Sequence, residues 1–427
     1  MNYSYNLVEL FSGIGSQAKA LKNIGCKVNT LGTCEWDLHA FVAYDAIHES
    51  TELPKDILAM TKEEILDYLS KYTLSNSGKE KMDFKTLKTY SEDTLKRILA
   101  AIRRTKNFVD VSSLQGESMP NNIDILTYSF PCQDLSNVGA FHGYNKGIDK
   151  DSGSRSSLLW QVGRILKEMK ENAKNLPRFL LLENVPTLLS ERHRGTFETW
   201  INELLELGYV SKYFHLNASS FGLPQNRPRL LMISVYVGDD LEKKKIVLDY
   251  FDSKEASDVV ADYVNSPHYK KIAVSELLRI NYEDKKLFDE AVECTPNDTV
   301  SRREIWDENP KIVLENGHLN PDISVIRTIT TKQDRNPNSG NLYFDCGIEG
   351  RGKFRYLTPR ECFLFMGFTD EDYDNIISNN PEIHRNSKLF PRDKLIRMAG
   401  NSIPVKLLEG IFLQVKRIDK LIGEQNV

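Results

Sequence analysis

Short apolar runs and amphipathic segments alternate along the first part of the chain. Residues 7–11 predict a buried strand, residues 17–24 have the spacing of a helix, and residues 28–33 form a second apolar run before Glu35. The alternation continues over about 240 residues. Repeated β-α-β units predict an α/β fold with a mainly parallel sheet that helices cover on both faces.

The same pattern predicts the later strands and helices. Two amphipathic segments predict helices, at residues 156–171 and 197–208. Apolar runs predict strands at 108–111, at 123–128, before the pair Glu183-Asn184, near 210–216, and at the end of residues 219–237. Ligands in open α/β sheets bind beyond the carboxyl ends of the strands, so polar residues at these ends are candidates for one common site.

The presence or absence of alternating strands and helices divides the chain into three predicted parts. Residues 1–239 form the predicted sheet domain, with a charged helical insertion at about 50–106. Residues 240–350 mix charged helices, loops and polar stretches without a β-α period, which predicts a separate, smaller and less regular domain. Organised helix returns in residues 351–427, which we expect to complete the first domain.

Composition narrows the protein class. The 427 residues are 40% hydrophobic and 27% charged, as in folded soluble proteins, and no apolar run has the length of a membrane span. The N-terminus lacks the pattern of a secretory signal, and six scattered cysteines without a C-x-x-C pair favour a reducing cytoplasm. We therefore expect a cytoplasmic protein without a metal and without a membrane partner.

Charge alone neither suggests nor excludes a nucleic-acid partner. The net charge is −4, yet residues 71–108 hold ten Lys or Arg against four Asp or Glu. A duplex interacts with the local surface more than with the total charge, although a single basic cluster is more often a solvated helix face.

A glycine turn follows the first predicted strand. The sequence Ser-Gly-Ile-Gly at residues 12–15 opens the first helix, and Glu35 ends the second strand about 20 residues later. Glycines let the backbone approach a ligand, and an acid at the next strand end accepts hydrogen bonds from a ribose. The third glycine of a dinucleotide fingerprint is missing, so a turn without a ligand remains an alternative.

One cysteine follows the strand predicted at 123–128. In the sequence DILTYSFPCQDLSN, Cys132 lies in a polar loop next to Pro131. A lone cysteine is usually a small buried hydrophobe. However, Gly13, Glu35, Asp110, Cys132 and Glu183 all follow predicted strands and would meet at one rim of the sheet, where a thiolate could act as a nucleophile.

Seven sequence blocks occur in the order known from one enzyme family. They are FSGIGS, CEW, FPCQDLS, LLENV, QNRPR, LTPRECFLFMGF and AGNSIP. With these blocks the chain resembles the DNA (cytosine-5) methyltransferases, over nearly its full length. The wording of several blocks and the charged insertion are most similar to the bacterial, mollicute-type branch, several members of which methylate CG.

The resemblance implies a fold and a catalytic set. The fold would be a Rossmann-like, S-adenosylmethionine-dependent methyltransferase sheet with a smaller target-recognition domain at 240–350. Cys132 would attack C6 of a cytosine rotated out of the duplex, Glu183 would hydrogen-bond its N3 edge, and Arg229 would hold its O2. Arg227 would position either the backbone or the cysteine loop.

The resemblance also implies S-adenosyl-L-methionine as cofactor, S-adenosyl-L-homocysteine as product, and no metal. Glu35 would bind the ribose hydroxyls, Trp36 would stack on the adenine, and Asp110 would meet the adenine amine. The full set of implied cofactor residues is Phe11, Gly13, Ile14, Gly15, Glu35, Trp36, Asp110, Val111, Pro131, Leu158, Asn401 and Ser402.

Double-stranded DNA is the implied substrate. Residues near it would include Gln133, Ser136, Asn184, Gln225, Thr328, Thr330, Lys332, Gln333 and Arg335. Polar side chains after Thr330 suit base edges, but contacts to phosphates alone are an equal alternative. A bacterial or phage restriction–modification role, a cognate restriction endonuclease, a nucleoid-associated location and a monomeric state are further expectations.

Other functions explain fewer of these residues. The same chemistry on tRNA is the main alternative, although a recognition segment of about 110 residues favours duplex DNA. A non-catalytic DNA-binding relative would not need the set of Cys132, Glu183 and Arg229. A nicotinamide oxidoreductase would explain the glycine turn alone. Two departures from the family pattern, Leu135 and Ser156, remove no reacting group.

Overall fold

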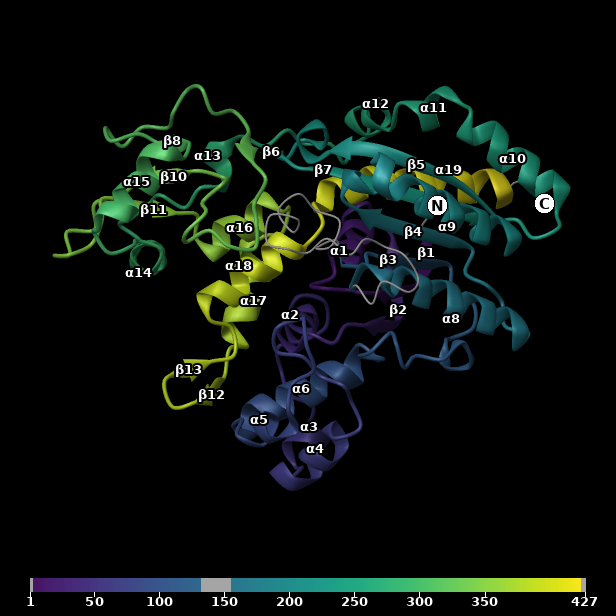
Figure 1. The fold of residues 1–427 in the computed structure, drawn as a ribbon, viewed down its shortest axis with the longest axis horizontal. Helices are drawn as coiled ribbons and strands as arrows, with labels where there is room; N and C mark the ends of the chain where they lie inside the picture. Colours follow the sequence, from purple (N-terminus) through teal and green to yellow (C-terminus); the bar gives the residue numbers. More distant parts are fainter. Residues whose placement is uncertain (1–2, 132–154, 424–427) are drawn as a thin grey trace.

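A mixed sheet of six strands forms the centre of the part of the molecule described by the computed structural model, residues 3–131 and 155–423 (Figure 1). Its strand order is β2-β1-β3-β4-β7-β5. The first four strands in this order run parallel, and β7 is antiparallel to both of its neighbours. The strands are β1 (Ser4–Leu10), β2 (Lys27–Cys34), β3 (Ile125–Tyr128), β4 (Phe179–Asn184), β5 (Tyr209–Asn217) and β7 (Pro228–Tyr236).

Alternate residues of each strand face opposite sides of the sheet. On β1, Leu7 belongs to one buried cluster and Val8 to the other, and on β4 Leu181 and Leu182 divide in the same way. All of these side chains are at most 2% exposed. Helices must therefore cover both faces, as the continuous apolar runs of the sequence predict.

Two groups of helices cover the sheet. One cluster joins the sheet to α1 (Ser16–Asn23), α2 (Leu38–His48) and α19 (Val405–Gly423). The opposite cluster joins it to α8 (Leu159–Glu171) and α9 (Glu191–Glu206). The described part of the chain also contains the short 3-10 helices η1 (Gly116–Ser118), η2 (Arg155–Leu158), η3 (Pro186–Leu189) and η4 (Ala218–Phe221).

The charged insertion is helical, as its spacing predicts. It contains α3 (Lys55–Leu58), α4 (Lys62–Leu69), α5 (Phe84–Lys88) and α6 (Glu92–Arg104), and it projects below the sheet in Figure 1. A capping box between Thr61 and Glu64 begins α4. Buried leucines and isoleucines of α6 join the core that also contains α2, so the insertion is packed onto the sheet domain.

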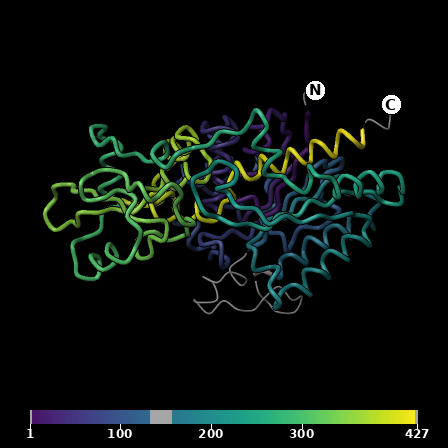
Figure 2. Tube along the Cα trace, turned by 90° about the horizontal axis from the view of Figure 1, so that it is seen from above, coloured from purple at the N-terminus to yellow at the C-terminus, as the bar shows by residue number. Residues whose placement is uncertain are grey.

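The predicted second domain has two structural parts. Its first helices, α10 (Leu241–Phe251), α11 (Lys254–Ser257) and α12 (Val259–Val264), lie near the sheet, where α10 packs on β5 and α19. The rest extends to one side in both views (Figures 1 and 2). It contains α13 (Val274–Leu277), α14 (Lys285–Glu293), α15 (Val300–Glu308) and a sheet of β8 (Lys311–Val313), β10 (Asn341–Tyr343) and β11 (Phe354–Tyr356). The division of the chain into domains stays a prediction.

Strand pairing and ion pairs join this lateral part to the core. Strand β6 (Gln225–Asn226) pairs with β9 (Ile326–Arg327). In addition, Glu361 at the start of α16 (Pro359–Phe365) forms an ion pair with Arg355, and both side chains are 0% exposed. The remaining elements are α17 (Asp370–Ser378), the hairpin of β12 (Glu382–His384) and β13 (Ser387–Lys388), and α18 (Arg392–Asn401).

The prediction of a strand at 108–111 is wrong, because this segment is a loop. The side chain of Asn107 bonds the backbone N–H and C=O of Glu35 at 3.0 and 2.9 Å, and Val109 adopts a left-handed conformation with φ of 68°. The backbone keeps one isolated parallel bridge, between Asn107 and Thr33, and the side chain of Asn107 makes the bonds to Glu35. Among the described helices, none is long and apolar enough to cross a membrane.

Candidate active site

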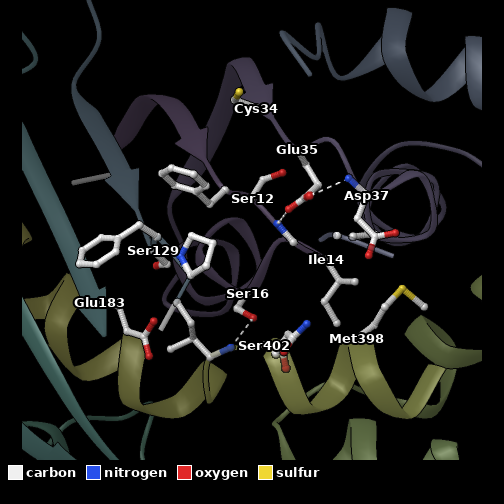
Figure 3. Close-up of a pocket in the computed structure, with 18 of the residues that line it drawn as sticks. Ser12, Ile14, Ser16, Cys34, Glu35, Asp37, Ser129, Glu183, Met398 and Ser402 are labelled. Atoms are coloured by element: carbon white, nitrogen blue, oxygen red, sulfur yellow. Dashed lines mark hydrogen bonds between the residues drawn. The ribbon is translucent and has the colours of Figure 1, made fainter. Parts of the chain in front are cut away.

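A cavity of about 400 Å³ opens at the carboxyl ends of the four parallel strands (Figure 3). Its walls include the residues directly after β1, β2 and β3, and the last residues of β4. The start of β7 and the connection between α18 and α19 complete it. This is the rim at which the sequence places the candidate residues.

Most of the predicted cofactor and catalytic residues line this cavity. The lining includes Phe11, Gly13, Ile14, Glu35, Trp36, Asp110, Val111, Pro131, Leu158, Glu183, Asn184, Arg227, Arg229, Asn401 and Ser402. Asp110 reaches it from the loop that replaces the predicted strand. Cys132, Gln133 and Ser136 lie outside the described residues, directly after Pro131.

Gly15 has a different place from the one predicted. It does not line the cavity but precedes α1, in a left-handed conformation with φ of 79°. A Cβ atom there would lie 2.2 Å from Nε2 of His48, so only glycine fits. The next residue, Ser16, accepts a hydrogen bond from Ile403 N at 3.3 Å and ties the start of α1 to the opposite wall.

Glu35 is held by two backbone donors. Its carboxylate accepts hydrogen bonds from Gly13 N at 3.1 Å and from Asp37 N at 2.9 Å (Figure 3). Burial, and then the negative charge of Asp37, raise the pKa of Glu35 to about 7. The two backbone donors therefore fix the orientation of the carboxyl group, which can accept hydrogen bonds from the hydroxyls of a ligand.

Glu183 and Arg229 form an ion pair at the other end of the cavity. Nε of Arg229 lies 2.9 Å from Oε1 of Glu183, and the side chains are 12% and 11% exposed. Burial raises the pKa of Glu183, against the opposing charges of Arg229 and Arg227. A carboxyl group of this kind can hold or release a proton next to a bound cation, which suits acid–base work on a polar ring.

Asn184 joins this pair to the loop that precedes Cys132. Its side-chain amide donates to Phe130 O at 3.1 Å and accepts from Val185 N at 2.9 Å. The amide thus fixes the chain two residues before the cysteine. Such a support orients a reactive loop without contacting the reacting atoms.

Arg227 is buried and bonds three carbonyl oxygens. Its guanidinium donates to Ile329 O at 2.7 Å, Gly400 O at 2.6 Å and Ser402 O at 3.0 Å. These oxygens belong to the lateral part of the molecule and to the C-terminal end of α18 with its C-cap. The two alternatives for Arg227, positioning of the backbone or of the cysteine loop, stay predictions, because Cys132 lies outside the described residues.

Of the described residues predicted near the DNA, Asn184 lines the cavity, whereas Gln225, Thr328, Thr330, Lys332, Gln333 and Arg335 do not. Gln225 is buried and bonds Phe365 O and Ile329 N, and Gln333 is 1% exposed and bonds Ser339 and Thr330. Gln333 therefore presents no free amide at the surface, which disagrees with base readout. Lys332 and Arg335 are exposed, while the hydroxyls of Thr328 and Thr330 donate to backbone carbonyls.

A family model described as "C-5 cytosine-specific DNA methylase" matches residues 77–417. The chain belongs to this family. The resemblance inferred from the seven sequence blocks is thereby confirmed.

Relatives of known name support the same assignment for this C-5 cytosine DNA methylase. The chain is 31% identical over 420 residues to the orphan methyltransferase M.SssI of Spiroplasma monobiae, covering 97% of this chain and 96% of that protein. It is 29% identical over 417 residues to the type II methyltransferase M2.ScrFI of Lactococcus lactis subsp. cremoris, covering 95% and 98%. The similarity to a mollicute protein agrees with the predicted branch.

Solved structures share the fold. The Dnmt2 methyltransferase of S. pombe superimposes with a TM-score of 0.56 at 15% identity, covering 97% of this chain and 99% of that one. The methyltransferase EhMeth of Entamoeba histolytica gives 0.54 at 13% identity, covering 98% of both chains. The predicted α/β methyltransferase fold is confirmed.

The cavity of this methylase is also lined by residues that the sequence analysis did not name as site residues. Ser12, Ser16, Gln17, Asp37, Gly78, Ser129 and Met398 are among its lining residues. Asp37 directly follows Glu35-Trp36 and caps α2, a signal that the sequence offers. Gly78 comes from the insertion, and no local pattern places it at the site. Within residues 3–131 and 155–423, no group of three or more His, Cys, Asp or Glu could hold a metal ion.

Proposed function

We propose that this protein transfers a methyl group from S-adenosylmethionine to C5 of a cytosine in duplex DNA, through a covalent bond to Cys132. The Glu183–Arg229 pair carries the proposal. It offers a cytosine ring one group for its N3 edge and one cation for O2. Asn184 fixes the loop leading to Cys132 beside this pair.

The residues of the cavity suit an adenosyl cofactor. Glu35 would accept hydrogen bonds from the ribose hydroxyls, Trp36 would stack on the adenine, and Asp110 would meet its amine. Gly13, Ile14 and the Asn401–Ser402 pair would surround the methionine end. The hydroxyl of Ser12 is buried without a hydrogen-bond partner in the described residues, as expected for a group that faces a ligand. Such a cofactor supplies a methyl group on a positively charged sulfur.

The reaction then follows from the proposed roles. The thiolate of Cys132 bonds to C6, and N3 takes a proton from Glu183, while Arg229 stabilises the charge at O2. C5 gains electron density and takes the methyl group. The proton at C5 leaves to a base, the bond between Sγ and C6 breaks, and N3 returns its proton to Glu183. The ring regains its double bond, and the thiolate is free again.

The biological setting is part of the proposal. A type II methyltransferase among the relatives supports a restriction–modification role with a cognate endonuclease, and the orphan relative supports a solitary role. The resemblance to the mollicute-type branch makes CG the first target to test. A monomer in the bacterial cytoplasm, acting on nucleoid DNA, completes the proposal.

Methyl transfer from tritiated S-adenosylmethionine tests the reaction. We expect label at C5 of cytosine in duplex DNA, and bisulfite sequencing of DNA from expressing cells then gives the target sequence. Label in tRNA alone, or in neither nucleic acid, would contradict the proposal.

A second experiment tests the nucleophile. Duplex DNA with 5-fluorocytosine at the target should trap a covalent adduct with the wild type, since C5 then has no proton to lose. Cys132→Ala should form no adduct while it retains binding of S-adenosylhomocysteine. An adduct that survives this substitution would place the nucleophile elsewhere.

A further inference from the structure

The helical insertion contributes a wall to the cavity of the sheet domain. Gly78 lines the cavity, and it belongs to a loop of residues 75–78 between α4 and α5, named here the cavity loop. None of the seven sequence blocks includes this loop. Its place in the site is therefore a property of the insertion.

Backbone hydrogen bonds join the cavity loop to the segment after β2. Ser75 N donates to Trp36 O at 2.8 Å, and Leu38 N donates to Ser75 O at 2.9 Å. Ser75 and Asp37 thereby form a parallel β-bridge. The insertion is thus bonded directly to the residues that flank the proposed adenine and ribose positions.

The shape of the cavity loop is fixed from within. The buried hydroxyl of Ser75 donates to Glu80 O at 2.6 Å and accepts from Gly78 N at 2.9 Å. Gly78 has a φ of 67°, and a Cβ atom there would lie 3.2 Å from Oδ2 of Asp37. A glycine at this position lets the loop approach the Asp37 carboxylate closely.

Arg397 of α18 bonds both the cavity loop and Asp37. Its guanidinium donates to Oδ2 of Asp37 at 2.6 Å and to Ser77 O at 2.8 Å. Lys394, one turn earlier, donates to Asn76 O at 2.7 Å. Helix α18 continues into Met398, Gly400 and Asn401, which line the cavity themselves. The insertion, the segment after β2 and α18 therefore meet at one guanidinium.

Asp37 links the contact with Arg397 to the carboxyl group of Glu35. Although burial opposes it, the hydrogen bond with His39 and the positive charge of Arg397 lower the pKa of Asp37, so it carries a negative charge. Its backbone N–H holds the carboxylate of Glu35, and its charge raises the pKa of Glu35. Both the position and the charge of the proposed ribose-binding acid therefore depend on Asp37.

We infer that the cavity loop and Arg397 close the cavity beside Glu35 and set the affinity for the adenosyl cofactor. Arg397 is a positioning residue that acts through Asp37, and Gly78 provides the close approach of the wall. The inference rests on the proposed function, since it takes S-adenosylmethionine as the ligand. It gives the helical insertion a role in cofactor binding.

Two substitutions with matched controls test this role. Arg397→Gln removes the cation, and Gly78→Ala adds a methyl group against Asp37. Arg103→Gln is the control for the first, because Arg103 pairs with Asp56 elsewhere on the insertion. Gly25→Ala is the control for the second, because Gly25 has a φ of 77° and a Cβ atom there meets nothing within 4 Å. Both glycine substitutions then share the same backbone strain.

The main measurement is the dissociation constant of S-adenosylhomocysteine by calorimetry, alongside the melting temperature of the ligand-free protein. We expect Arg397→Gln and Gly78→Ala to weaken binding about tenfold or more, as for the loss of one charge-assisted contact. KM for S-adenosylmethionine should rise in proportion, with kcat within about threefold, because only uniform binding is lost. The controls should bind within about twofold of the wild type.

Unchanged affinity in both test variants would overturn the inference, and so would equal losses in tests and controls. A lower melting temperature with unchanged affinity would show a purely structural role and would overturn it as well. If the wild type itself bound no S-adenosylhomocysteine, the proposed function would fail together with this inference. The wild-type titration therefore separates the two failures.

Discussion

Nε of Arg229 lies 2.9 Å from the carboxylate of Glu183, because the strands that carry them are neighbours in the sheet. Asn184 at the end of β4 is in register with Leu230 of β7. Arg229 therefore falls beside the carboxyl end of β4, at the rim of the cavity. The antiparallel insertion of β7 into a parallel sheet thus places a cation next to a strand-end acid.

Loss of either member of this pair should impair methyl transfer. Arg229→Ala leaves Glu183 without its cation and removes the proposed contact to O2, so we expect kcat to fall by about 10²–10³-fold. Glu183→Gln should have an effect of similar size. The double variant should lose less than the product of the two single losses, since both groups act on one ring. Single-turnover methylation assays measure all three.

The control for this experiment is Arg194→Ala, which removes an exposed ion pair with Glu198 on α9. It should leave kcat within about twofold. Arg229→Lys should give an intermediate rate, because it keeps the charge but loses the planar donor geometry. An Arg229→Ala variant with full activity would refute a role for the pair in the reaction.

Arg227 should matter mainly for stability. Arg227→Ala leaves the carbonyls of Ile329, Gly400 and Ser402 without this donor, so we expect the free energy of unfolding to fall by about 2–4 kcal/mol. The exposed Arg327 offers a control, and Arg327→Ala should change it by less than about 0.5 kcal/mol. Urea denaturation followed by fluorescence measures both. Equal stability of the two variants would contradict the structural role.

Loss of the fully buried ion pair between Arg355 and Glu361 should strongly destabilise the protein. Glu361 also accepts hydrogen bonds from Arg279 N and Thr358 N, both at 2.8 Å. Glu361→Ala leaves an uncompensated cation in the core, at an expected cost of about 3–5 kcal/mol. Asp289→Ala breaks an exposed pair with Lys285 and should cost less than about 0.5 kcal/mol. Thermal and urea unfolding distinguish these outcomes.

Glu9 predicts a pH dependence of stability. It is 0% exposed on β1 and is bonded by Tyr44 and Ala18. Burial raises its pKa from 4.5 to about 7, despite these donors. The folded state therefore binds more protons than the unfolded state between these values. The stability contributed by Glu9 is complete below about pH 4.5 and is lost as the pH rises through about 7.

Glu9→Gln should remove this dependence. Between pH 5 and 8 the wild type should lose up to about 3 kcal/mol relative to the variant. The quantity to compare is the difference in the free energy of unfolding between wild type and variant at each pH. Burial lowers the pKa of His48 to about 3, so His48 makes the stability of both proteins rise with pH below about pH 6.5. Urea unfolding at several pH values measures it. Parallel profiles of the two proteins would show that Glu9 does not titrate in this range.

The sequence predicts the rim of the sheet well because the rule behind it is geometric. Parallel strands end at one edge, so residues directly after apolar runs meet there, as Gly13, Glu35 and Glu183 do. The family blocks add the chemical identities that spacing alone leaves open. Both predictions depend on short segments, where local pattern and position in the sheet are linked.

The remaining differences come from contacts between distant segments. Beyond a single backbone bridge to Thr33, Asn107 bonds Glu35 through its side chain, which an apolar run at 108–111 does not reveal. Gln333 is buried and accepts a hydrogen bond from Ser339, although its polar neighbours suggest a surface loop. Gly78 reaches the cavity only because the insertion folds back onto Asp37. None of these contacts has a local signal in the chain.

The packing of α19 on α1 has a consequence for synthesis of the protein. Asn23 at the end of α1 donates to Glu409 of α19 at 2.7 Å across 386 residues of chain. A growing polypeptide must therefore expose the apolar face of its first helix until residues 405–423 have left the ribosome. Chaperones that hold nascent chains should accordingly bind this protein through most of its translation, and release it when α19 closes over the sheet.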